Sequence, residues 1–186
     1  MKLPFLKNPI IRFLVLFIVL LLLLDNCATA YIGITSPGNT YYSFLDHYLN
    51  VFDWYRTYLL NGAHYLTDVV GCPSFISDKF HLRLVGGRSI QIVYSCLGVG
   101  LLSLWTAYII AYPAKIKKKF AWLFLGLFLI SFLNMVRLAA LVIIVTKTKW
   151  NFENHHTYFN VAVYICITIM IYFYTKEPKE DSLSKK

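Results

Sequence analysis

Three places in the sequence carry side chains that together could perform acyl transfer. Cys96 lies where an alternating segment runs into an apolar one, Arg137 lies inside a long apolar run, and His155 and His156 precede the last apolar run. A thiolate can attack a carbonyl, and a neighbouring histidine can take the thiol proton or hold the thiolate as an ion pair. An arginine can stabilise the resulting oxyanion or bind a substrate carboxylate. The pattern predicts a cysteine-dependent site, provided that the fold brings these places together.

Arg137 is the most informative of these residues. A single cysteine at the start of a helix is usually structural, and a histidine pair beside an apolar run usually lies at an interface. A charge between Val136 and Leu138, by contrast, is expensive in lipid unless it is paired or reaches water. Asn134 lies three residues earlier on the same helix face, where its amide can hold the guanidinium or donate a hydrogen bond of its own.

The composition indicates a membrane protein. Of the 186 residues 58% are hydrophobic and 17% aromatic, which exceeds the apolar share of an ordinary soluble domain and fits aromatic belts at two interfaces. The net charge of +9 comes largely from lysines beside apolar runs, so we expect no nucleic-acid partner. No C-x-x-C pair and no cysteine–histidine cluster with ligand spacing occurs, so neither a metal nor a cofactor is predicted. Cys27 and Cys72 could pair on an oxidising face, whereas Cys166 lies within the last apolar run.

The N-terminal segment, residues 1–32, is predicted to be the first membrane span. Basic residues precede an uncharged run, and Ala28 and Ala30 resemble a signal-peptidase cleavage motif. The apolar stretch from Ile10 to Ile32 is also long enough for an uncleaved span, and we favour a retained anchor. Both interpretations place the N-terminus in the cytoplasm and residue 31 outside.

The next segments are predicted to lie outside the bilayer. Residues 33–40 have turn composition, and residues 41–70 form a helix interrupted by charged residues and histidines, which favours an interfacial position. Residues 75–95 are predicted to form a β-hairpin with its turn at Gly86–Gly87. Its apolar face is expected to carry alternate side chains of both strands: Phe80, Leu82, Leu84, Ile90, Ile92 and Tyr94.

Three further spans complete the predicted topology, and together they form the predicted catalytic part of the chain, residues 96–174. They cover residues 97–112, 120–145 and 157–174, and a lysine cluster at 115–119 marks the cytoplasmic side between the first two. The tail at 175–186 is then cytoplasmic. We therefore predict one integral-membrane domain over residues 1–186, mainly α-helical, with about four spans, an interfacial helix and a small extracytoplasmic hairpin.

This topology brings the reactive residues to one depth. Cys96 lies at the outer end of its span, because the chain enters from the hairpin. Arg137 follows Phe120 by 17 residues, a rise of about 25 Å in a hydrocarbon core of about 30 Å. The histidines lie at the outer start of the last span. Spacing and topology thus predict an extracytoplasmic site.

The residues resemble the exosortase/archaeosortase family of integral-membrane, cysteine transpeptidase-like sorting enzymes, and the chain is similar to its compact members from Bacteroidetes. The resemblance covers about residues 80–175. It rests on the hairpin that leads into Ser95-Cys96-Leu97-Gly98, on Asn134-Met135-Val136-Arg137, and on the histidine before the last span. It implies that Cys96 is the nucleophile, Arg137 the transition-state partner and one histidine the base. A family glycine after the histidine has no evident counterpart. His156, four residues before Asn160, is preferred over His155, and the choice stays open.

The resemblance also implies a substrate class and a location. The substrates would be exported proteins that end in a short motif, an apolar span and a basic tail. The enzyme would cut near the motif and transfer the acyl group to an acceptor, for which a lipid and a polysaccharide are the candidates. It would be a multi-pass protein of the bacterial inner membrane with its site on the extracytoplasmic side. Ser95, Gly98 and Asn134 would support the catalytic residues.

Two other functions fit the same composition. A non-enzymatic scaffold of an envelope polysaccharide or secretion system would need no reactive thiol, so Cys96→Ala would leave it working. A membrane thiol-disulfide oxidoreductase would need a second cysteine, for which Cys72 is the candidate, and Cys72→Ser would then abolish its activity.

Overall fold

The computed structural model describes residues 8–36, 41–147 and 155–176, without the side chains of residues 155–160. The chain divides into two compact units, residues 1–152 and 153–186, each considered by itself. Within the described ranges the first unit contains α1 (Pro9–Thr35), α2 (Ser43–Leu49), α3 (Val51–Val69), β1 (Ser74–Asp78), β2 (His81–Leu84), β3 (Ser89–Gln91), the 3₁₀ turn η2 (Tyr94–Leu97), α4 (Val99–Ala111) and α5 (Ile116–Lys147). The second unit contains α6 (His155–Lys176). The predicted mainly helical class is confirmed.

Helix α1 extends beyond the predicted span. Its first turn is capped by Asn8, whose side chain accepts a hydrogen bond from the backbone N–H of Ile10. The polar residues that interrupt its apolar run do not end it, because Asn26 and Thr29 donate back to helix carbonyls. The helix therefore continues to Thr35, into the segment predicted as a turn, of which residues 37–40 lie outside the described residues.

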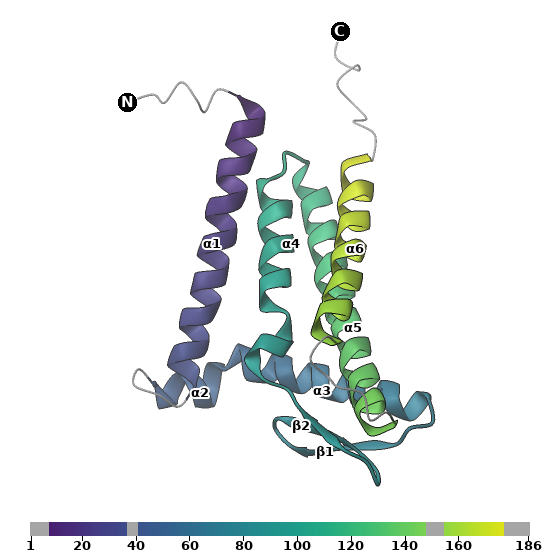
Figure 1. The fold of residues 1–186 in the computed structure, drawn as a ribbon. Coiled ribbons are helices and arrows are strands. Elements are labelled where there is room, and N and C mark those ends of the chain that lie inside the picture. The colour runs from purple at the N-terminus through teal and green to yellow at the C-terminus, as the bar shows by residue number, and fades with distance from the viewer. Residues whose placement is uncertain (1–7, 37–40, 148–154, 177–186) are drawn as a thin grey trace. The chain divides into compact units, whose positions relative to one another are not determined.

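The predicted helix at 41–70 is divided in two at Asn50. The Asn50 side chain accepts the backbone N–H of Asp53 at 3.0 Å and so caps α3, while its amide donates to Asp46 of α2 at 2.6 Å. Helix α3 runs across the ends of α4 and α5 (Figure 1). It buries Leu59, Leu60 and Ala63 and leaves Tyr58 and Tyr65 exposed, an amphipathic division that fits an interfacial helix.

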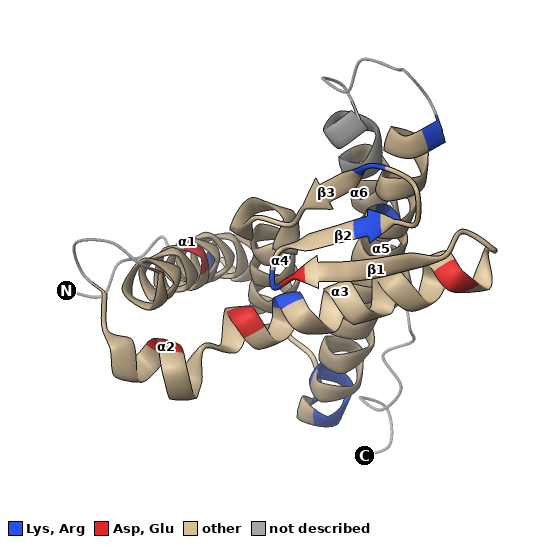
Figure 2. Ribbon diagram, turned by 90° about the horizontal axis from the view of Figure 1, so that it is seen from below, with Lys and Arg blue, Asp and Glu red and all other residues tan. Residues whose placement is uncertain are grey.

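The hairpin predicted at 75–95 is part of a three-stranded antiparallel sheet in the order β1-β2-β3. The β2–β3 turn contains Gly86 at φ 70°, as the two glycines predicted, and Leu82, Leu84 and Ile90 are buried. Strand β1, which pairs with β2 in the register Ser74↔Leu84, was not predicted. Strand β3 also ends early, at Gln91, so Tyr94 belongs to η2. Figure 2 shows the strands side by side near α3.

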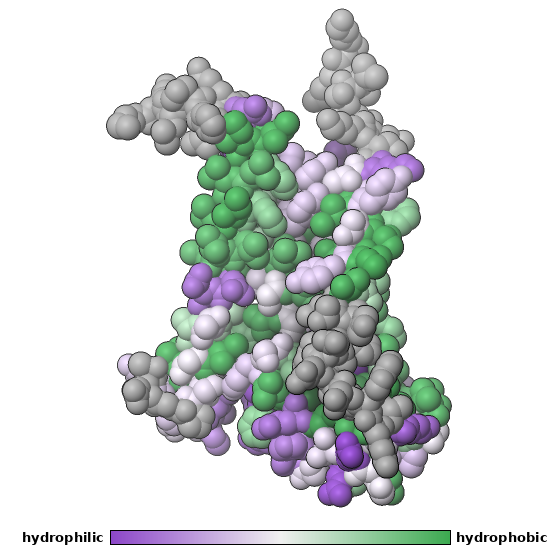
Figure 3. Space-filling model, in the orientation of Figure 1, coloured by the Kyte–Doolittle hydropathy of each residue, from purple (hydrophilic) through white to green (hydrophobic). Residues whose placement is uncertain are grey.

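The apolar helices pack lengthwise in the first unit. Rings of α1 meet rings of α4 edge to face, with centroids 5.7 Å apart between Phe13 and Tyr108. Among the described residues, two helices, α1 and α5, are long and apolar enough to cross a membrane, whereas α4 and the Val161–Lys176 part of α6 are shorter apolar helices. The surface over much of α1 is apolar (Figure 3). The number of four spans stays a prediction.

The contact between α4 and α5 depends on a glycine. Trp105 of α4 is fully buried, and its indole N–H donates to the carbonyl of Trp122 at 3.2 Å. A β-carbon at Gly126 would lie 2.0 Å from the indole nitrogen, closer than two atoms can approach. The indole is a rigid ring packed on all sides, so it cannot move aside without disturbing its neighbours.

We expect Gly126→Val to destabilise the protein by about 1–3 kcal/mol or more, because overpacking at this contact separates α4 from α5. Thermal unfolding of the detergent-solubilised full chain measures the effect. Gly33→Val in α1 is the matched control, since no atom lies within 4 Å of a β-carbon built at Gly33. An equal change in both variants would contradict the packing argument.

Candidate active site

Cys96 lies on a tight turn between the sheet and α4. Turn η2 places the backbone N–H of Cys96 2.9 Å from the carbonyl of Val93. Gly98 then adopts the left-handed conformation, with φ 71° and ψ 26°, and its carbonyl accepts the first backbone hydrogen bonds of α4. Glycine adopts this conformation without a steric penalty, and the change of direction lets α4 begin within three residues of the thiol. The sequence predicted a strand running directly into the cysteine, whereas in the structure β3 ends at Gln91 and Cys96 lies within the turn η2.

Asn134 of α5 holds the cysteine turn from the other side. Its side-chain amide donates to the carbonyl of Cys96 at 3.0 Å, and both residues are buried. A β-carbon at Gly98 would lie 3.5 Å from the same amide nitrogen, so the helix and the turn are in close contact there. We predicted that this amide would hold the guanidinium of Arg137 or donate a hydrogen bond of its own, and the structure contains a donation to the carbonyl of Cys96.

Arg137 follows Asn134 by one helical turn on the same face of α5, so it lies next to the contact with the cysteine turn. It is buried, at 8% exposed, and its neighbours along α5, Met135 and Leu138, belong to the same core cluster as Cys96. Ser95 is exposed beside the thiol. The first unit thus brings Cys96 together with Asn134, which lies 38 residues later in the chain, and Arg137 follows one helical turn beyond Asn134 on α5.

The two candidate bases begin α6. His155 and His156 are in the second unit, and their side chains, like that of Asn160, lie outside the described residues. The choice between the two histidines therefore stays a prediction. All four cysteines, at positions 27, 72, 96 and 166, are free thiols in the structure.

Two polar clusters near the site were missed in the sequence. Arg56 of α3 is 1% exposed and lies over the ring of Tyr94, the first residue of the cysteine turn. Beyond it on α3, the Nδ1 atom of His64 lies 2.9 Å from the hydroxyl of Ser74 and 3.5 Å from the carboxylate of Asp68. A catalytic triad needs its serine and its carboxylate on opposite ring nitrogens, so this second cluster is structural.

One tyrosine of α3 connects this helix to α5. The Tyr55 hydroxyl is hydrogen-bonded to that of Ser131 at 3.0 Å. Burial raises the pKa of Tyr55, so the phenol stays neutral and remains a hydrogen-bonding partner over the physiological pH range. The contact fixes the crossing of α3 over the part of α5 that precedes Asn134.

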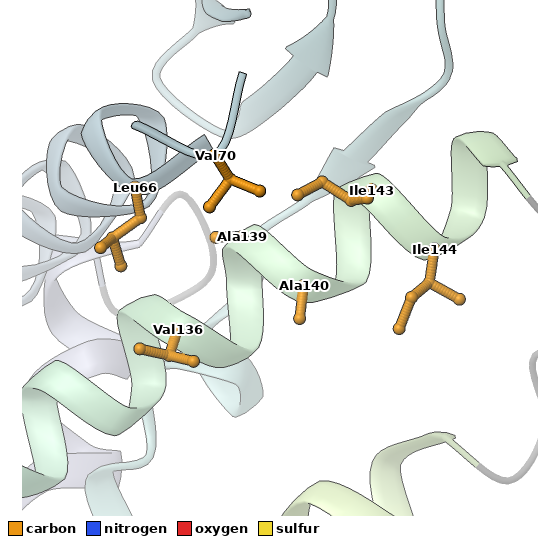
Figure 4. A pocket seen from close by; sticks show the side chains of 7 residues that line it. All are labelled: Leu66, Val70, Val136, Ala139, Ala140, Ile143 and Ile144. Carbon is orange, nitrogen blue, oxygen red and sulfur yellow. The ribbon is translucent and has the colours of Figure 1, made fainter. Parts of the chain in front are cut away.

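An apolar groove lies beside the Arg137 turn, between the end of α3 and α5. It has a volume of about 360 Å³ and is lined only by aliphatic side chains: Leu66, Val70, Val136, Ala139, Ala140, Ile143 and Ile144. Figure 4 shows these side chains on the two helices and, for Val70, just after the end of α3. Because the lining offers no hydrogen-bonding side chain, the groove can hold only an apolar group.

We expect Asn134→Leu to lower the stability by about 1–3 kcal/mol, because the buried carbonyl of Cys96 loses its donor. Asn134→Gln is the informative companion, since it keeps the amide but displaces it by one methylene. Unfolding of the purified full chain in detergent measures both. Wild-type stability of the leucine variant would show that the carbonyl has another donor.

Comparison with known proteins gives one match. The family model described as transmembrane exosortase (Exosortase_EpsH) matches residues 39–173 of the chain. No curated protein and no solved structure gives a significant match. The matched range begins before α2 and ends within α6, so it includes Cys96, Asn134, Arg137 and both histidines.

Proposed function

Because this integral-membrane chain belongs to the transmembrane exosortase family, we propose that it is a cysteine peptidase or transpeptidase that processes the C-termini of exported proteins. The observation that carries the proposal is the contact between Asn134 and the carbonyl of Cys96. Through this contact, Cys96 lies just before the N-terminus of the apolar helix α4 and next to the turn of α5 that runs from Asn134 to Arg137. A thiol and a guanidinium in this arrangement suit attack on a peptide carbonyl.

The proposed reaction has two steps. The thiolate of Cys96 attacks the scissile carbonyl carbon, and the guanidinium of Arg137 stabilises the oxyanion that forms. The C–N bond breaks, the leaving amine takes a proton from the imidazolium of His156 or His155, and a thioester remains on Cys96. A hydroxyl, an amine or water then attacks the thioester, and its proton returns to the imidazole. Water gives hydrolysis, and another nucleophile gives transfer.

The proposed substrates are exported proteins that carry a short motif, an apolar span and a basic tail. The apolar groove beside Arg137 supports this class, because it offers an aliphatic surface next to the reacting residues. We place the site on the extracytoplasmic side of the bacterial inner membrane. Lysines 115 and 117–119 lie at the opposite end of α4 and α5 from Cys96, and such clusters stay in the cytoplasm.

The thioester intermediate provides the test. The protein is isolated from cells that express an exported reporter with such a C-terminus, and Cys96 is analysed by mass spectrometry. We expect an acyl adduct on Cys96 that hydroxylamine releases. It should fail to form if the active histidine is replaced, because the thiol then loses its base and the leaving amine its proton donor, and His155→Ala and His156→Ala should differ. Absence of any adduct in all three proteins would favour the scaffold function. A disulfide from Cys96 to Cys72 would favour the oxidoreductase.

A further inference from the structure

Arg56 of α3 is a buried charge that the proposed reaction does not use. Its side chain is 1% exposed, and its Nη1 donates to the carboxylate of Asp53 at 2.8 Å. Within the part of the chain that the structure describes, its Nε and Nη2 have no hydrogen-bond acceptor. Burying a charge with open donors is unfavourable, and an apolar residue of similar size is often as stable or more so. Stability alone therefore does not account for an arginine at this position.

The guanidinium contacts the turn that carries Cys96. Its central carbon lies 4.4 Å from the centre of the Tyr94 ring and 4.6 Å from that of the Phe80 ring. A cation over an aromatic face is attracted most strongly where water is excluded, as it is here. Tyr94 opens η2 and precedes Cys96 by two residues. The charge of Arg56 thus acts on one end of the cysteine turn.

The partners of Arg56 are themselves held in place. The backbone N–H of Asp53 donates to the side chain of Asn50, and Lys79 lies 3.8 Å from the second carboxylate oxygen of Asp53. Phe80 is fixed by its backbone N–H, which donates to the carboxylate of Asp78 at 2.7 Å. The guanidinium therefore has a defined direction, and it presents its face to Tyr94.

Turn η2 has few other restraints at this end. No side chain caps its first turn, and the backbone N–H of Cys96 donates to the carbonyl of Val93, the residue before the turn. Asn134 holds the carbonyl of Cys96 from α5. We propose that Arg56 is a positioning residue for Cys96, which fixes the start of the turn through the Tyr94 ring while Asn134 fixes its end. The proposal rests on the proposed function only in treating Cys96 as the nucleophile.

The test combines variants with local thiol reactivity in the purified full chain. Arg56→Met keeps the length of the side chain without its charge. Tyr94→Ala removes the ring, and Tyr94→Phe keeps it. Arg83→Met is the matched control, because Arg83 is an exposed arginine of β2 whose Nε donates to the Gly87 carbonyl. For each protein we measure the alkylation rate of Cys96 by N-ethylmaleimide, with Cys72 as internal reference, together with the melting temperature and reporter processing.

We expect Arg56→Met to speed alkylation of Cys96 by roughly 2- to 30-fold, the range that one cation–π contact supplies, while Cys72 reacts as before. The melting temperature should stay the same or rise, and processing should fall. Tyr94→Ala should likewise speed alkylation of Cys96 and lower processing, although loss of a ring packed on the core will also lower its melting temperature. The Arg56→Met/Tyr94→Ala double variant should alkylate no faster than the faster single variant, because both changes remove one contact. Tyr94→Phe and Arg83→Met should match the parent. Arg56→Lys should rescue processing only in part, since an ammonium keeps the charge but not the planar shape.

Two results would overturn the proposal. In the first, Arg56→Met leaves both Cys96 alkylation and processing unchanged. In the second, the reactivity of Cys72 rises together with that of Cys96 and the melting temperature falls, which would mean general loss of structure. If processing instead survives Cys96→Ala, the proposed function fails, and the alkylation rates still decide whether Arg56 fixes the turn.

Discussion

Cys96→Ala is expected to abolish processing of exported reporter proteins, with a fall in rate of at least about a thousandfold, because loss of the nucleophile removes the covalent route altogether. Cys96→Ser should be nearly as inactive, since a hydroxyl in place of the thiol is a much weaker nucleophile at neutral pH. Pulse labelling of a reporter that ends in an apolar span and a basic tail, followed by analysis of its C-terminus, measures the rate.

Two matched variants make this result specific. Cys72→Ala and Cys166→Ala remove thiols of the same chain that lie outside the cysteine turn, and both should process the reporter normally. Full activity of Cys96→Ala at normal protein levels would refute a cysteine mechanism and support the scaffold function. Loss of activity in Cys72→Ser as well would support thiol-disulfide chemistry.

Arg137→Lys is expected to slow processing by roughly a hundred- to a thousandfold, which is the usual effect of removing one oxyanion donor. Lysine keeps the positive charge, so charge pairing and membrane topology should persist, but the planar fork of donors is lost. The measurement is the rate of reporter cleavage at equal protein level, together with the amount of acyl adduct on Cys96.

The control for this variant is Arg83→Lys on β2, which should process the reporter at the parent rate. If Arg137→Lys retained full activity, the role of Arg137 would be that of a charge alone. If the amount of Arg137→Lys protein in the membrane fell, the role of Arg137 would be structural. A slow variant that still folds and inserts, and that accumulates no adduct, would place Arg137 in the first chemical step.

The sequence was most informative where the relevant interactions are local. The alternation of Leu82, Leu84 and Ile90 and the glycines of the turn predicted the β2–β3 hairpin, since side-chain alternation and positive φ are properties of neighbouring residues. Long apolar runs likewise predicted the helices. Strand β1 lacked such a signal, because the sequence from Ser74 to Asp78 does not alternate and the strand is determined by its pairing with β2.

The contacts of the candidate site, in contrast, join residues that are far apart in the sequence. Asn134 and Arg137 were identified from their spacing on one helix, but the acceptor of the Asn134 amide lies 38 residues away, in the cysteine turn. In the sequence Arg56 is one of several charges in an amphipathic helix, and nothing local distinguishes it from an exposed arginine. Its burial depends on the rings of Phe80 and Tyr94, which only the folded chain brings onto α3. The placement of the histidines relative to Cys96 stays a prediction.

The short length of α4 has a consequence for the bilayer around Cys96. Its 13 residues rise about 20 Å, whereas the 27 residues of α1 beside it rise about 40 Å. In the predicted four-span topology, a hydrocarbon core of about 30 Å cannot match both helices, so the lipid next to α4 would thin, or polar headgroups would descend toward the cysteine turn. A substrate span entering along α4 would then leave the hydrocarbon early, and its final turn would face water and unwind. Hydrophobic mismatch would thus expose an extended peptide bond at the level of the thiol.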